Sequence, residues 1–253
     1  MSSLCSTREQ SAYATGRMAR EDERLFRPGG LALTARAIAL ASLGAGATVV
    51  DLGCGAGQSL GYLRTLGIHA VGIDCAGGDE QPAPGPGSYE HIVASAEDLP
   101  FPDRSVDGVL AECSLSVMHD QNRVLAECAR VLTDGGRLMI SDLYARQPSA
   151  IAHVRAFKSS CIAGMIVRDE LEAHLAVHGF EVNAWEDHSK ALCECAARFI
   201  LENGSMAGLW QCDGEDSAAT IQAAMKAVRA GYFLMVATRS RRDPQKGGWN
   251  DER

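Results

Sequence analysis

A glycine-rich turn follows a short apolar run, and this pairing constrains the fold more than any other part of the sequence. Residues 48–52 read Thr-Val-Val-Asp-Leu, the pattern of a short buried strand. The strand runs into the loop Asp51–Gly57 (Asp-Leu-Gly-Cys-Gly-Ala-Gly), and a helical pattern starts at Gln58. A glycine turn between a strand and a helix lets backbone amides approach a ligand closely. The segment therefore predicts a ligand-binding loop in an α/β sheet.

The spacing of the glycines narrows the choice of ligand. A dinucleotide-binding turn has the pattern G-x-G-x-x-G, whose third glycine allows close packing of helix on strand. Here Gly53 and Gly55 match, but the position of the third glycine is taken by Gln58. A phosphate-binding P-loop is excluded, because no Gly-Lys-Ser/Thr follows. A nicotinamide-dependent dehydrogenase is therefore the weaker alternative.

Strand and helix patterns alternate along most of the chain. Strands are predicted at 48–52, 70–74, 91–94, 106–111, 137–141, 180–185 and 232–238, and helices at 31–43, 58–66, 123–132, 149–164, 168–178 and over most of 189–230. Residues 76–88 are rich in Gly and Pro, so a loop is expected where a helix would be usual. This order predicts an α/β fold with a doubly wound, mostly parallel seven-stranded sheet and a helical C-terminal elaboration.

Several motifs in order resemble those of class I methyltransferases that use S-adenosylmethionine (SAM). The loop Asp51–Gly57 resembles their motif I, and matching elements continue over residues 45–145. The resemblance implies a Rossmann-like methyltransferase fold, SAM as the cofactor and a small-molecule methyl acceptor. The cofactor-binding residues that it implies are Asp51, Gly53, Cys54, Gly55, Gly57, Asp74, Ser95, Ala96, Glu97 and Glu112.

The resemblance also implies a role for each end of the cofactor. Asp51 would support the loop and the methionine amino group, and Asp74 would accept hydrogen bonds from the ribose hydroxyls. The segment 94–101 (Ala-Ser-Ala-Glu-Asp-Leu-Pro-Phe) resembles the family's adenine-binding segment. Ser95 stands where an aspartate is common, so Ser95 or Glu97 would have to replace that contact.

The acceptor side offers two candidate catalytic residues, Cys161 and His188. Residues 111–120 and 160–165 are similar to segments of arsenite methyltransferases, in which the cysteine matched by Cys161 binds trivalent arsenic. The cysteine that those enzymes carry shortly after motif I is missing, and the match around Cys212 is loose. His188 follows the strand 180–185 and could act as a general base. Two alternatives therefore stay open: an arsenite methyltransferase-like enzyme using Cys161, and a SAM-binding protein without catalysis.

Composition and domain organisation set the remaining expectations. Residues 1–240 are expected to form one methyltransferase domain, with 45–145 as the SAM-binding core, 146–240 as the substrate side and 241–253 as a disordered tail. The net charge of −8 gives no support for binding to nucleic acid or to an anionic membrane. An odd number of cysteines, nine, argues against a disulfide framework, and no metal site is expected. Without a signal sequence or an apolar span, a cytoplasmic location is expected.

Overall fold

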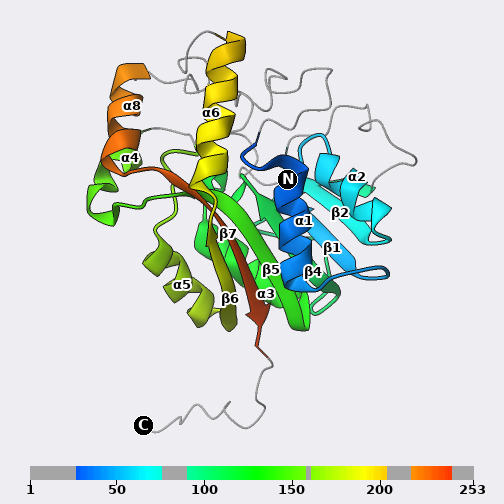
Figure 1. Ribbon diagram of the computed structural model, residues 1–253. Helices are drawn as coiled ribbons and strands as arrows, with labels where there is room; N and C mark the ends of the chain where they lie inside the picture. The colour runs from blue at the N-terminus through cyan, green and yellow to red at the C-terminus, as the bar shows by residue number, and fades with distance from the viewer. Residues whose placement is uncertain (1–26, 76–89, 158–160, 204–217, 241–253) are drawn as a thin grey trace, which may run out of the picture.

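The computed structural model describes residues 27–75, 90–157, 161–203 and 218–240 (Figure 1). The helices are α1 (Gly30–Ala41), α2 (Gln58–Thr65), α3 (Gln121–Val131), α4 (Ala152–Arg155), α5 (Arg168–Val177), α6 (Ser189–Asn203) and α8 (Ala218–Ala227), with short 3₁₀ turns η2 (Leu115–Val117) and η3 (Pro148–Ala150). The strands are β1 (Thr48–Leu52), β2 (His69–Asp74), β3 (Glu90–Val93), β4 (Val106–Glu112), β5 (Leu132–Tyr144), β6 (Phe180–Asp187) and β7 (Gly231–Arg239).

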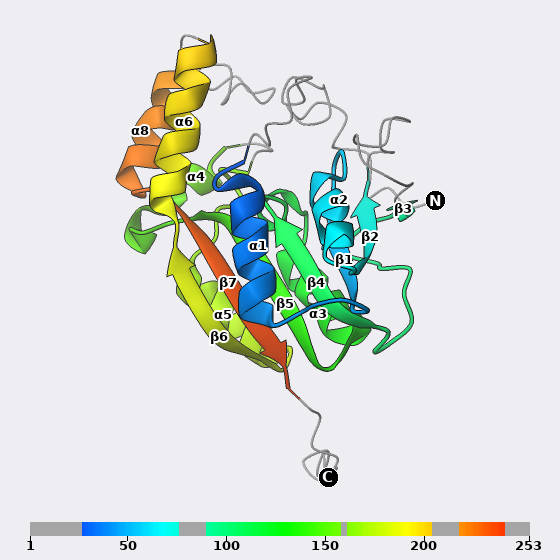
Figure 2. The same ribbon diagram turned by 45° about the vertical axis from the view of Figure 1, so that its right-hand side comes forward.

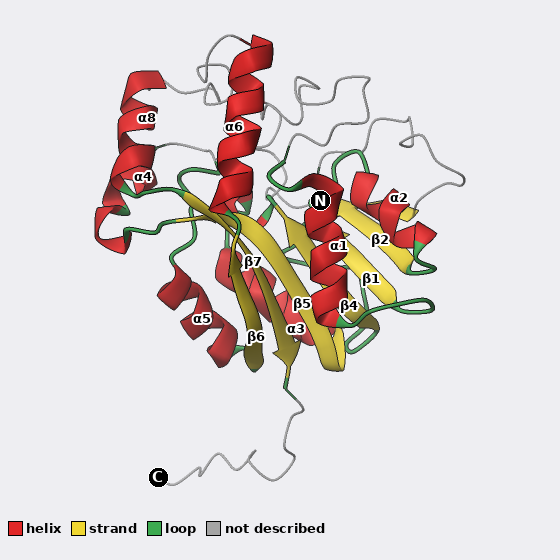
Figure 3. Ribbon diagram, in the orientation of Figure 1, coloured by secondary structure: helices red, strands yellow, loops and turns green. Residues whose placement is uncertain are grey.

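All seven strands belong to one sheet, in the order β3-β2-β1-β4-β5-β7-β6 (labelled in Figure 2, yellow in Figure 3). The first five strands of the chain pair in parallel. Strand β7 runs antiparallel between β5 and β6. The predicted doubly wound, mostly parallel seven-stranded sheet is thereby confirmed.

Helices cover both faces of the sheet, with α1 and α2 on one face and α3 and α5 on the other (Figure 2). Each face has its own buried cluster of aliphatic side chains. Leu33, Ile38 and Leu60 pack on the α1 and α2 side, whereas Leu125 and Leu175 pack on the other. Burial of these two apolar layers is the main stabilising contribution to the fold.

The carboxyl ends of the parallel strands meet at one edge of the sheet, and this edge carries the glycine loop. Strand β6 ends at the same edge, because it is antiparallel to β7, which is antiparallel to β5. Helices α6 and α8 rise beyond this edge, on the β6 side (Figures 1 and 2). Ligands of open parallel sheets bind at this edge, so the fold itself locates the site.

Two local predictions differ from the structure. The predicted helix at 149–164 is wrong: η3 and the single turn of α4 occupy its first part, and residues 161–164 form a turn. The turn brings Gly164 against the carbonyl of Ser116, a tertiary contact that helical periodicity cannot anticipate. Strand β5 starts at Leu132, earlier than predicted, and its register with β4 jumps from Val106↔Leu132 to Gly108↔Arg137. Gly135 and Gly136 lie within this irregular stretch of β5.

Some expectations fall outside the described residues, namely the loop at 76–88, Cys212 and the disordered tail at 241–253. Among the helices of the described part, none is both long and apolar enough to cross a membrane.

Candidate active site

The glycine loop turns sharply above the end of β1. Gly53, Gly55 and Gly57 all have positive φ angles, of 71°, 50° and 75°, which side chains other than glycine rarely adopt. The amides of Gly53 and Cys54 donate to the carbonyl of Ile73, at 2.7 and 3.2 Å, and so tie the loop to β2. A Cβ atom added at Gly55 would meet nothing within 4 Å, so this part of the loop faces open space. The loop is therefore tied to β2 and open to a ligand at Gly55.

Two buried aspartates belong to this site, one from β1 and one from β2. Asp74 is buried at the end of β2, and its Oδ2 accepts a hydrogen bond of 3.0 Å from the amide of Gly55. Asp51 is buried at the end of β1. The pKa of Asp51 is raised to about 8: burial is the largest cause, the nearby Glu112 and Asp74 also raise it, and Arg27 lowers it. This pocket therefore holds an excess of acidic groups with little water to screen them.

Glu112 connects the end of β4 to the two helices on the same face. Its carboxylate accepts hydrogen bonds from Ser59 of α2 at 2.8 Å and from Thr34 of α1 at 3.0 Å, and it forms an ion pair with Arg27. The side chain of Glu112 is 3% exposed. The structure thus places Glu112 beside Asp51, with its oxygens already engaged by protein donors.

The predicted adenine segment is held together by its own side chains. The hydroxyl of Ser95 donates to the carboxylate of Glu97, whose Oε1 accepts from the amide of His119 at 3.1 Å. Glu97 therefore connects this segment to the residues that precede α3. Ala96 is buried between them.

The part of this edge next to β5 is built around Tyr232, the second residue of β7. Its hydroxyl lies 2.9 Å from the sulfur of Cys113 and donates to the carbonyl of Ser141 at 3.2 Å. Cys113 adopts a φ of 53°, a strained conformation for a non-glycine residue that is common at functional sites. Burial raises the pKa of the Cys113 thiol, and the charges of Asp142 and Cys161 add to this effect. Cys161 and Cys113 both pack against the hydrophobic cluster on the α1 side of the sheet.

A buried aspartate at the end of β5 positions the segment that follows β4. Asp142 accepts from the amide and the hydroxyl of Ser116, at 2.8 and 2.7 Å. Burial raises the pKa of Asp142 to about 6, although these hydrogen bonds oppose the rise. The side chain of Gln121 donates to the carbonyl of Gly164 at 2.9 Å and holds the Cys161 turn against the same segment.

His188 lies just beyond the end of β6, next to Tyr232. Its backbone amide donates to the carbonyl of Tyr232 at 2.8 Å, and its Nε2 lies 3.0 Å from a carboxylate oxygen of Glu186. Arg36 of α1 binds the same carboxylate through Nε at 3.1 Å. The hydrogen bond from Arg36 lowers the pKa of Glu186, and the bond from His188 adds to the shift. An ionised Glu186 can therefore orient the imidazole.

Sequence reasoning missed several of these residues, of which Arg27, Thr34 and Asp142 are the most informative. The sequence holds one clue to the role of Thr34. This residue lies on a buried helix face whose other members include Leu33, Ala37 and Ile38, all apolar. A lone polar residue on a buried face needs a partner, and here that partner is Glu112.

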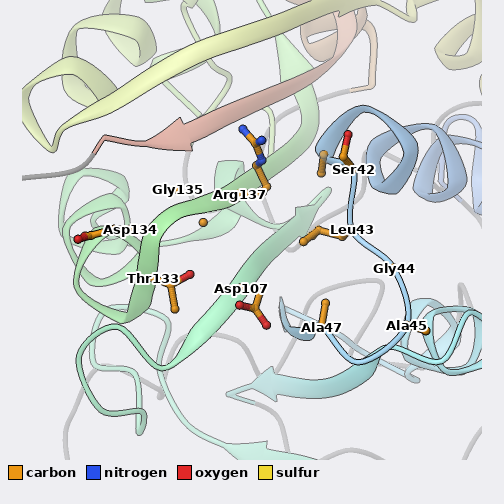
Figure 4. A pocket seen from close by; sticks show the side chains of 12 residues that line it. Ser42, Leu43, Gly44, Ala45, Ala47, Asp107, Thr133, Asp134, Gly135 and Arg137 are labelled. Atoms are coloured by element: carbon orange, nitrogen blue, oxygen red, sulfur yellow. The ribbon is translucent and has the colours of Figure 1, made fainter.

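A shallow hollow of about 420 Å³ lies elsewhere, at the opposite edge of the sheet (Figure 4). It is lined by the loop from α1 to β1 and by the start of β5, with Asp107 between them. The carboxylate of Asp107 accepts from the amide of Thr48 at 2.9 Å. This hollow is remote from the glycine loop, so it does not contribute to the site.

Comparisons with known proteins agree with this geometry. The methyltransferase domain family matches residues 50–140. An O-methyltransferase of Aspergillus nomiae is 34% identical over 152 residues, which are 56% of this chain and 68% of that protein. The 27-O-demethylrifamycin SV methyltransferase of Amycolatopsis mediterranei is 33% identical over 172 residues, 62% of each chain, so less than two thirds of that enzyme is spanned.

A solved structure extends the likeness in fold. The geranyl diphosphate C-methyltransferase of Streptomyces coelicolor, solved with S-adenosyl-L-homocysteine, superposes with a TM-score of 0.60 at 19% identity and covers 94% of this chain and 88% of its own. The fold and the glycine-loop site thus define a SAM-binding α/β enzyme. The chain belongs to the class I SAM-dependent methyltransferases, as the sequence motifs predicted.

Proposed function

We propose that this methyltransferase methylates an oxygen atom of a small organic molecule. Two of its relatives carry names that specify O-methyl transfer, and one of those names specifies a small-molecule acceptor. The acceptor would lie above the carboxyl end of β5 and the amino end of β7, next to Cys113 and Tyr232. The observation that carries the proposal is the pair formed by His188 and Glu186 at this edge, because an oxygen acceptor has to lose a proton.

The residues around the glycine loop fit the cofactor. Gly55 faces open space, Asp74 is fixed by the loop amide, and the acidic groups beside Asp51 suit a ligand that carries positive charge. When bound, SAM supplies a methyl group on a positively charged sulfur. Asp51 would hold the ammonium group of the methionine, and Asp74 would accept hydrogen bonds from the ribose.

His188 would act as the general base in this proposal. Glu186 fixes the ring through Nε2 and Arg36 keeps that carboxylate ionised, so a proton taken up by the imidazole is stabilised by a neighbouring negative charge. Two strands, β5 and β7, separate the ends of β4 and β6, a span of roughly 15 Å at the usual strand spacing. The acceptor would therefore place its hydroxyl over these two strands. Cys161 would contact the acceptor from the opposite side.

Replacing the base tests the proposal. For His188→Gln we expect kcat to fall by about 100-fold or more, with unchanged affinity for S-adenosylhomocysteine. His153→Gln is the matched control, since His153 contacts the carbonyl of Ala150 on the exposed surface. A variant with wild-type kcat would overturn the assignment of His188.

One observation favours a second candidate, a thiol-dependent metalloid methyltransferase. Cys113 and Cys161 pack against the same hydrophobic cluster, and thiolates are good ligands for trivalent arsenic. The arsenite methyltransferase of Halobacterium salinarum is 31% identical over 161 residues, which are 39% of that protein. Arsenite should then bind the wild type and fail to bind Cys161→Ser. Equal binding by Cys161→Ser would exclude this candidate.

A further inference from the structure

Arg27 carries a buried guanidinium that none of the sequence motifs includes. It lies just before α1, with a side chain that is 9% exposed. One terminal nitrogen forms an ion pair with Glu112 and the other donates to Thr34. The third nitrogen, Nε, is buried and has no hydrogen-bond partner among the described residues. A buried donor without a partner is costly, and this one lies next to the expected methionine end of the cofactor.

The charges around Arg27 are unbalanced. Three buried carboxylates, those of Asp51, Asp74 and Glu112, gather at the ends of β1, β2 and β4. Burial lowers the pKa of Arg27, but Glu112, Tyr232 and Asp51 raise it by more. The other buried arginine in the described part of the chain, Arg239, bonds to the carbonyl of Leu132 at the opposite edge. Arg27 is thus the buried cation of this pocket within the described ranges.

The amino-acid end of SAM has a carboxylate as well as an ammonium group. The acidic groups suit the ammonium, but they would repel the carboxylate strongly in a pocket with little water. We infer that Arg27 binds the α-carboxylate of SAM, and that Glu112 and Thr34 are positioning residues that hold its guanidinium in place. Arg27 and Asp51 would then recognise the two opposite charges of the amino-acid end, one each.

This inference deepens the proposed function and rests on it only for the cofactor. It assigns Glu112 a different role from the one that the family resemblance implied. Glu112 would act through Arg27 instead of contacting the cofactor, because its oxygens already accept from Arg27, Thr34 and Ser59.

Calorimetry with two ligands tests the inference without any acceptor. The probes are SAM and decarboxylated SAM, which keeps the sulfonium and the amine but lacks the carboxylate. We expect the wild type to prefer SAM by about 10- to 100-fold, the size of a charge-assisted bidentate contact. Arg27→Met should lose this preference and bind decarboxylated SAM within about twofold of the wild type. Arg104→Met is the control, because Arg104 is half exposed and faces Asp134; its ligand preference should be that of the wild type.

A double variant distinguishes a direct contact between Arg27 and the ligand from an effect of the unpaired charge on Glu112. Arg27→Met leaves Glu112 buried and unpaired, which could prevent folding, whereas Arg27→Met with Glu112→Gln removes both charges. The double variant should still lack the preference for SAM. Recovery of that preference, or an equal loss of affinity for both ligands in Arg27→Met, would overturn the inference. A wild type that binds neither ligand would instead overturn the cofactor assignment itself.

Discussion

Asp51 lies between two other carboxylates and one guanidinium, and this position has a cost in stability. Its pKa of about 8 in the folded protein lies well above the ordinary value of 3.8. Between these two pH values, the unfolded chain has lost the proton that the folded protein keeps. Stability therefore decreases as the pH rises through this range.

Asp51→Asn should remove that dependence. We expect the ligand-free variant to melt at a higher temperature than the wild type at pH 8, with a smaller difference at pH 5. Affinity for SAM should fall by about tenfold or more, because the ammonium loses its charged partner. Thermal unfolding at both pH values, with calorimetry for SAM, measures both effects. A variant that melts below the wild type at pH 8 would contradict the assigned burial cost.

Gly164 is a second residue whose replacement has a specific expected effect on stability. A Cβ atom built there would lie 1.9 Å from the carbonyl oxygen of Ser116, so Gly164→Ala has to push the two segments apart. We expect a loss of about 1–3 kcal/mol in the free energy of unfolding and a lower kcat. The matched control is Gly44→Ala, where the added atom meets nothing within 4 Å. Equal denaturation midpoints for the two variants would contradict the close contact.

At the level of elements, the sequence predicted most of the sheet. Residues 48–52, 70–74 and 232–238 are mostly apolar, as expected of strands that are covered on both faces. The helix predicted at 149–164 failed because the contact of Gly164 with Ser116 is tertiary. Arg27 was missed for a similar reason, since nothing near it in the chain shows that Glu112, 85 positions away, is its partner.

The 3₁₀ turn η2 depends on β5 for its position, and Asp142 makes that connection. Asp142→Asn places an amide nitrogen against donors from Ser116 and Leu143, so at least one buried donor loses its acceptor. We expect a loss of about 1–3 kcal/mol in stability and an increase in KM for the acceptor. Affinity for S-adenosylhomocysteine should change little, because Asp142 lies on the acceptor side. Chemical denaturation measures the stability and steady-state kinetics measure the KM. A loss of affinity for S-adenosylhomocysteine, with stability and KM unchanged, would contradict this role of Asp142.

At the scale of the whole molecule, the proposed cofactor site and the proposed acceptor site lie along one edge of a single sheet. The proposed cofactor residues, at the ends of β1, β2 and β4, could be grouped from the sequence because they lie in short motifs such as Asp51–Gly57. The proposed acceptor site depends on Cys113, Tyr232 and His188, which come from three distant parts of the chain. Their convergence is decided by the antiparallel insertion of β7, and no local pattern encodes it.

Methyl transfer from labelled SAM tests the central claim most directly. The full chain is incubated with SAM carrying an isotope-labelled methyl group and a pool of hydroxylated small molecules, and the products are analysed by mass spectrometry. We predict a labelled small molecule and an equal amount of S-adenosylhomocysteine from the wild type and from the exposed control Asp169→Ala. Asp74→Ala should reduce both by about tenfold or more. Absence of labelled product and of S-adenosylhomocysteine binding in the folded wild type would contradict the account.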